Sequence, residues 1–178
     1  MRKKLNGRAG FTLVEMLAAT LILIMLVLML GTGLQMTVRS YQKITARSEV
    51  DLLLSTAIDA LADDLRFARN VAEVSGANVD GKEVCSDFTY TSDSFAGTIR
   101  LELDGNGHIV ANNTEPDGGR KRFLSTGVYG VEGAYKVSEM KIEYTRSKKI
   151  FTIELTVQAA ADSSIEASGT VTVRCLNP

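Results

Sequence analysis

The chain has 178 residues, of which 45% are hydrophobic, a size and composition that fit one ordinary domain with an added segment. Its formal net charge is −1, and only 6% of its residues are aromatic, with no Trp. These values argue against a general basic surface and against a row of stacking rings for nucleic acid.

The first predicted element is an apolar helix that follows a basic start. Four bases and no acid come first, Arg2, Lys3, Lys4 and Arg8, and no charged side chain occurs from Met16 to Val38. This run is longer than the roughly 20 apolar residues that cross a bilayer, and it is too long for the apolar core of a cleaved signal peptide. We therefore expect residues 11–38 to span a membrane once, with the basic start in the cytoplasm and the later residues outside.

Glu15 is the only acid of this apolar segment. A charge within hydrocarbon costs at least ~2.5–3.5 kcal/mol on insertion scales, so such a residue usually has a partner or a function. The structural alternative is that Glu15 lies shallow and reaches the lipid headgroups.

The stretch Gly10-Phe11-Thr12-Leu13-Val14-Glu15, placed between a basic leader and an apolar run, resembles the processing signal of type IV pilins and of type II secretion pseudopilins. The resemblance covers Gly10 to about Val38 and extends to the later residues only in layout. It implies that a prepilin peptidase removes residues 1–10 by cutting between Gly10 and Phe11. It also implies N-methylation of the new amino group on Phe11.

The resemblance gives Glu15 a partner, because cleavage creates a positive amino group on Phe11. The pair can form within one helix, since the two residues are four apart. The family places it between neighbouring pilin subunits, where an unpaired charge in a low dielectric is costly. The expected partners are therefore the prepilin peptidase, other subunits, the cytoplasmic (inner) membrane and the pilus assembly machinery. The expected location is first that membrane, with the outer domain extracytoplasmic, and then a cell-surface pilus or pseudopilus.

The helical pattern continues beyond the apolar run. Leu54, Ile58, Leu61, Leu65, Ala68 and Ala72 recur at spacings of three and four, which predicts an amphipathic half over residues 39–74 and a stop near Gly76. Arg39, Lys43 and Arg47 are interpreted as a solvated or headgroup-level collar. Gly31 and Gly33 are either close-packing positions or a weak point of the helix, since glycine costs about 1 kcal/mol relative to Ala in a helix.

Residues 75–178 are expected to form an exported domain of loops and an antiparallel sheet. Alternating apolar residues predict strands at Phe88–Thr91, Thr98–Leu103, His108–Ala111, Arg122–Ser125, Met140–Thr145, Phe151–Val157 and Thr170–Arg174. One buried face of about four to six strands needs a cover, and the amphipathic half of the helix can supply it. The predicted fold class is α+β with a pilin-like layout.

Cys85 and Cys175 are the only cysteines. In an exported domain they are expected to form a disulfide that closes about 90 residues and stabilises the fold by at most ~4–5 kcal/mol. Two buried thiols are the alternative.

No cofactor, metal site or catalytic constellation is expected. The segment from Asp104 to His108 suggests a hairpin turn rather than a calcium loop, although Glu115 stands at the twelfth position, because the sixth position holds Ile109 instead of glycine. Two basic clusters, Arg120–Arg122 and Arg146–Lys149, are interpreted as solvated loop charge, with a grip on DNA phosphates as the alternative.

The sequence thus predicts a non-enzymatic filament subunit, a minor pilin or pseudopilin that assembles through its N-terminal helix. The alternative is an uncleaved single-pass membrane protein whose outer domain binds a ligand or partner. A hydrolytic enzyme is the third possibility, for which the sequence offers no catalytic residues.

Overall fold

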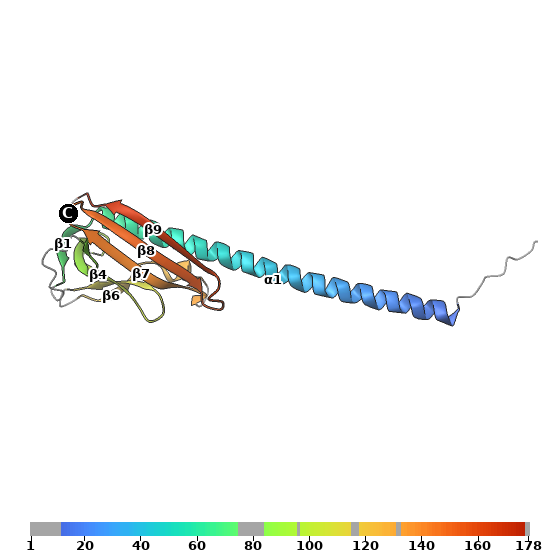
Figure 1. The fold of residues 1–178 in the computed structure, drawn as a ribbon. Helices are drawn as coiled ribbons and strands as arrows, with labels where there is room; N and C mark the ends of the chain where they lie inside the picture. Colours follow the sequence, from blue (N-terminus) through green and yellow to red (C-terminus); the bar gives the residue numbers. More distant parts are fainter. Residues whose placement is uncertain (1–11, 75–83, 96, 115–117, 131–132, 177–178) are drawn as a thin grey trace, which may run out of the picture. The chain divides into compact units, whose positions relative to one another are not determined.

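The computed structural model describes residues 12–74, 84–95, 97–114, 118–130 and 133–176, and its first element is the helix α1 (Leu13–Arg66) (Figure 1). The chain divides into two compact units, Met1–Lys43 and Ile44–Pro178, and α1 contributes residues to both. In the first unit the described residues are those of the helix and Thr12 before it.

In the second unit, α1 buries one face. The fully buried positions recur every three or four residues and are Val50, Leu53, Ala57, Leu61 and Leu65. Leu61 and Leu65 confirm the predicted face, whereas Leu54 and Ile58 lie at its flank and are only partly buried. Ile58 reaches Gly169, where a Cβ would come within 2.8 Å of the Ile58 Cδ1, so the glycine allows the helix to approach this strand closely.

The prediction that the helix continues to about Val74 is wrong, because α1 ends at Arg66. The N–H groups of Phe67 and Ala68 bond to carbonyls three residues back, and Asn70 adopts a positive φ of 50°. The chain then enters β1 (Arg69–Glu73), which pairs with β3 (Phe88–Ser92). Strand pairing therefore takes over the backbone hydrogen bonds that a longer helix would have made. The predicted stop at Gly76 lies outside the described residues.

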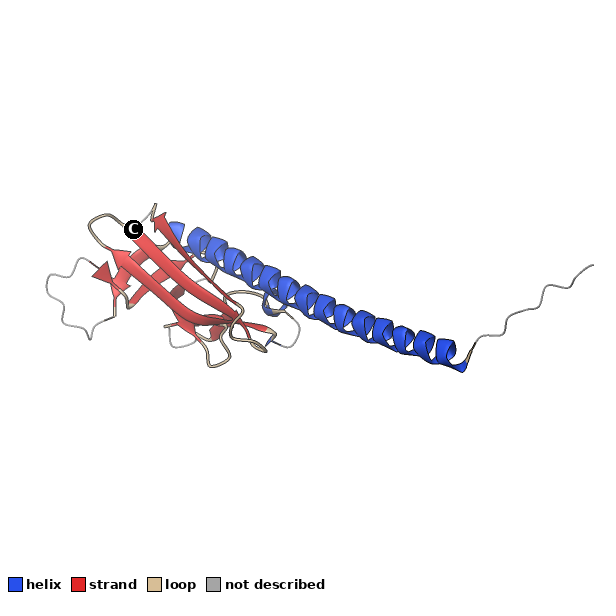
Figure 2. Ribbon diagram, turned by 45° about the vertical axis from the view of Figure 1, so that its right-hand side comes forward, coloured by secondary structure: helices blue, strands red, loops and turns tan. Residues whose placement is uncertain are grey.

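The strands form two antiparallel sheets (Figure 2). The five-stranded sheet has the order β1-β3-β4-β5-β6, and the four-stranded sheet has the order β2-β7-β8-β9. The remaining bounds are β2 Val84–Cys85, β4 Gly97–Leu103, β5 Ile109–Asn113, β6 Arg120–Arg122, β7 Tyr135–Thr145, β8 Ile150–Ala159 and β9 Glu166–Arg174, with a short 3-10 helix, η1, at Thr126–Tyr129.

The α+β class and most predicted strands are confirmed, but the single sheet of four to six strands is wrong. The β4–β5 hairpin has the expected register, with Leu103 opposite Ile109, and the β7–β8 hairpin turns at Arg146–Lys149 as predicted. Alternation along a strand reveals that one face is buried, but it does not reveal which sheet the strand joins. Nine strands are therefore distributed over two sheets in the described part of the chain.

The two sheets and the C-terminal part of α1 share one core. The ring of Phe88 in β3 lies 6.3 Å from Tyr144 in β7 and 5.3 Å from Phe151 in β8. At the end of the helix, Asp64 accepts hydrogen bonds of 2.6 Å from the hydroxyls of Tyr90 and Ser92. Because Tyr90 is fully buried, this carboxylate satisfies a hydroxyl that has no access to water.

The structure does not contain the disulfide expected between Cys85 and Cys175. Cys85 lies in β2 and Cys175 directly follows β9, and these strands are the opposite edges of the four-stranded sheet. The strands β7 and β8 lie between these two edges, so strand pairing does not place the two cysteines next to each other. The Cys175 thiol instead donates to the carbonyl oxygen of Ala68 at 3.1 Å and ties the C-terminal segment to the end of α1.

Candidate functional site

The most unusual surface of the molecule is the N-terminal part of α1. Every large hydrophobic residue from Leu13 to Val38 is at least half exposed. The helix is long and apolar enough to cross a membrane, judged by its length and composition. A surface that is apolar on all sides of a helix requires lipid or other apolar helices around it.

The hydroxyl groups of this segment bond to the helix itself. Thr20 donates to the carbonyl of Leu17 at 2.9 Å, and Thr37 donates to the carbonyl of Gly33 at 3.0 Å. Thr32 donates to carbonyls three and four residues before it. Because these three hydroxyls already have acceptors within the helix, they do not oppose its entry into an apolar environment.

Glu15 and Thr12 form a capping box at the start of α1. The carboxylate Oε2 of Glu15 accepts from the Thr12 N–H at 2.8 Å and from the Thr12 hydroxyl at 3.0 Å. In return, Thr12 Oγ1 accepts from the Glu15 N–H at 3.3 Å. This role of Thr12 was not among the predictions, although the spacing Thr-x-x-Glu before an apolar run is the sequence signature of a capping box.

The other predicted residues of this region lie apart from the capping box or outside the described residues. Gly10 and Phe11, the predicted cleavage site, lie outside them. The helix passes without interruption through Gly31 and Gly33, and beyond the neighbouring residues and backbone of the helix itself no described atom lies within 4 Å of where their Cβ atoms would be. The two glycines therefore do not end the helix, and neither packs closely against another described part of this chain.

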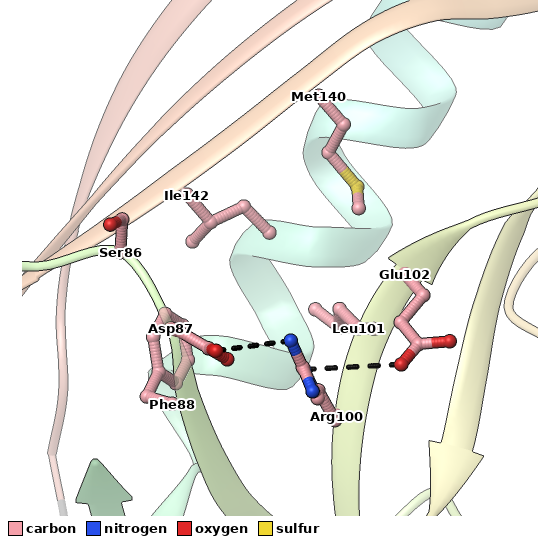
Figure 3. Close-up of a pocket in the computed structure, with 8 residues that line it drawn as sticks. All are labelled: Ser86, Asp87, Phe88, Arg100, Leu101, Glu102, Met140 and Ile142. Atoms are coloured by element: carbon pink, nitrogen blue, oxygen red, sulfur yellow. Dashed lines mark hydrogen bonds and ion pairs between the residues drawn. The ribbon is translucent and has the colours of Figure 1, made fainter. Parts of the chain in front are cut away.

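A cleft of about 260 Å³ lies in the second unit between the corner before β3, strand β4 and strand β7 (Figure 3). Arg100 stands in it between two acids, with Nη2 3.0 Å from Asp87 and Nε 3.9 Å from Glu102. Glu102 also bonds to Arg120 at 2.6 Å. Burial acts to raise the pKa of Glu102, but the hydrogen bond from Arg120 and the other cationic and amide neighbours lower the pKa overall. The charges of the cleft are thus paired with one another.

The predicted turn before β5 is confirmed. Asp104 Oδ1 accepts from the N–H groups of Asn106 and His108, and the His108 ring lies 4.4 Å from Tyr129. Burial acts to raise the pKa of Asp104, but the N–H donors of His108 and Asn106 outweigh it and lower the pKa. Among the described residues no three His, Cys, Asp or Glu side chains are grouped as metal ligands.

The two basic clusters belong to different sheets. Arg120, Lys121 and Arg122 form the exposed edge strand β6 of the five-stranded sheet. Arg146–Lys149 is the exposed turn between β7 and β8 of the other sheet. Strand pairing therefore does not join the two clusters into one basic row along a sheet.

The chain matches no model of a known protein family, no curated protein and no solved structure in the comparisons made. Its long N-terminal apolar helix followed by antiparallel sheets is compatible with a pilin-like fold.

Proposed function

We propose that the protein is a filament subunit, a minor pilin or pseudopilin of a type IV pilus or a related assembly. Removal of residues 1–10 would leave a chain that begins at Phe11 and retains the whole of α1. The observation that carries the proposal is the apolar surface from Leu13 to Val38, which is exposed on every side. A signal peptide would be discarded, whereas this segment is long enough first to hold the precursor in a membrane and then to pack against other copies.

The capping box supports a specific role for Glu15 in that assembly. Both bonds from Thr12 go to Oε2, and among the hydrogen bonds of the described residues Oε1 takes no part. A carboxylate has about four acceptor positions on its two oxygens. Glu15 can therefore cap its own helix through Oε2. Its Oε1 can at the same time accept a hydrogen bond from the Phe11 ammonium group of a neighbouring subunit.

The pairing provides both attraction and register. In the low dielectric of packed apolar helices, an ammonium and a carboxylate attract strongly, and each is costly to leave alone. A new subunit would move until its Phe11 ammonium met Glu15 of a resident subunit, which fixes the stagger between two otherwise uniform apolar helices. The outer domains would then form the filament surface.

Replacement of Glu15 by Ala tests this role. The variant should still be inserted and cleaved, because the apolar run and the Gly10–Phe11 bond are unchanged, but its amount in sheared filaments should fall strongly. Glu15→Asp is the matched control, since it keeps the charge on a shorter side chain and should assemble better than the Ala variant. Incorporation of Glu15→Ala at the level of the unmodified protein would refute the role.

A further inference from the structure

A second pocket lies at the C-terminal end of α1 and differs from the cleft of Figure 3 in its chemistry. It has a volume of about 350 Å³ between the last helical turns, the β3–β4 turn and the residue after β6. We call it the acidic aromatic pocket and define it by Asp63, Asp64, Phe67, Asp93, Phe95 and Phe123.

Aromatic rings form the apolar part of this pocket. Phe95 and Phe123 stack with their centroids 5.3 Å apart, and both are only partly buried. Phe67, directly after α1, is 50% exposed. Exposed ring faces attract cations through the negative charge of the π-system, within about 6 Å of the ring centroid.

The charged groups that line the pocket are all acidic. Asp63 and Asp93 are exposed and form ion pairs with Arg66 at 3.5 Å and Arg69 at 2.7 Å, while Asp64 binds the hydroxyls described above. Exposed pairs of this kind contribute little to stability, so the two carboxylates can exchange partners at small cost. The end of a 54-residue helix lies here as well, and the partial negative charge of a helix C-terminus favours cations.

The chain itself carries a segment with the complementary charge. The β7–β8 turn presents Lys148 and Lys149 in exposed positions. Lys149 has a φ of 56°, in the left-handed region that glycine or asparagine would occupy with less strain. A lysine at this position is therefore not explained by the geometry of the turn.

The turn and the pocket lie at the same end of the outer domain. The Lys149 carbonyl accepts from the Cys175 N–H at 2.9 Å, and the next residue, Leu176, donates to the Arg66 carbonyl at the end of α1. No residue of the turn lines the pocket of its own chain. Two copies standing in one membrane with the same orientation would present turn and pocket at the same level.

We propose that the acidic aromatic pocket receives the lysines of the β7–β8 turn from a second copy of this chain, which joins neighbouring outer domains. The ammonium groups would lie against the Phe67 face and bond to Asp63 and Asp93. The contact rests on the proposed function only in that both copies stand in the same membrane, and it involves neither cleavage nor Glu15.

A carbodiimide that joins ammonium and carboxylate groups without a spacer tests the contact directly. The uncleaved full chain is reconstituted into lipid bilayers as a mixture of isotopically labelled and unlabelled copies, so that links between copies are identified by mass. We expect mixed-isotope links from Lys148 or Lys149 to Asp63 or Asp93. Lys148→Ser with Lys149→Gly should reduce dimer yield about tenfold, while Lys141→Ser, which removes a lysine from β7, should leave it unchanged.

The variant with Lys149→Gly should fold as well as the unmodified chain, because glycine suits a positive φ. Its thermal unfolding therefore separates lost association from lost folding. Phe67→Ala should also lower the yield, since it removes the exposed ring. Links found only within single copies, or an unchanged dimer yield in the double variant, would overturn the contact. Because the leader is intact in this experiment, either outcome leaves the cleavage proposal unaffected.

Discussion

The two halves of α1 show how one secondary structure can serve two environments. Between Ile44 and Arg66 the helix buries a face of Val, Leu and Ala against two sheets, and Ile44 and Leu52 are the large hydrophobic residues that it exposes there. Between Leu13 and Val38 every large hydrophobic residue is exposed, and the hydroxyls bond to the helix itself. The first pattern is completed within the chain, whereas the second leaves an apolar surface that no described part of the chain covers.

The largest expected difference between the halves is in the stability of the second unit, Ile44–Pro178. Leu61 is fully buried, so Leu61→Ala should leave a cavity and lower the free energy of unfolding by about 2–5 kcal/mol. The matched change Leu26→Ala removes the same atoms from a residue that is 54% exposed and should leave the unfolding of the second unit unchanged. Thermal unfolding of the full chain in detergent measures both. Equal losses would remove the distinction between the halves.

An introduced charge should be harmful in the apolar N-terminal half of α1 and tolerated at an exposed position of the C-terminal half. Leu26→Arg places a cation in the middle of the apolar run and should lower membrane insertion by about 2.5–3.5 kcal/mol on insertion scales. Leu52→Arg places the cation at a position of the C-terminal half of α1 that is 60% exposed, where insertion and stability should hardly change. The retained fraction after alkaline extraction of membranes gives the comparison. Full retention of Leu26→Arg would argue against a membrane-spanning segment.

The sequence predicted the elements that local patterns determine. The turn residues Asp104-Gly105-Asn106-Gly107 correctly located the β4–β5 hairpin, and the apolar run correctly located the exposed half of α1. The end of the helix was not predictable in this way, because Asp64 bonds to Tyr90 and Ser92, which lie 26 and 28 residues later. The division into two sheets depends on similar long-range contacts. The Thr12–Glu15 capping box, by contrast, was visible in the sequence and was missed.

Two tyrosines, one buried in the core and one exposed on the helix, allow the same comparison with a smaller expected effect. Tyr90→Phe removes the buried hydroxyl that binds Asp64 and should lower the free energy of unfolding by about 1–2 kcal/mol, whereas Tyr41→Phe at a residue that is 70% exposed should cost nothing measurable.

Burial, followed by the charge of Asp64, raises the pKa of Tyr90 well above 10.0. The native fold therefore opposes ionisation of Tyr90, so stability should be full below pH 10 and fall as the pH rises further. Chemical denaturation at several alkaline pH values should show a smaller fall for Tyr90→Phe.

The smallest expected effect concerns the helix start. Thr12→Ala removes the hydroxyl of the capping box and should lower helix stability by about 1 kcal/mol, while Thr12→Ser should retain most of it. Amide exchange in the first turns of α1 measures the change, and the second unit should be unaffected. Equal exchange in both variants would show that the hydroxyl does not stabilise the start of the helix.

The most direct test of the account is the mass and sequence of the N-terminus in protein isolated from its own cells. Assembly through a retained apolar helix predicts a mature chain that begins with N-methylated Phe11 and still contains the segment from Leu13 to Val38. A chain that begins at Met1, or one cut after Val38, would contradict it.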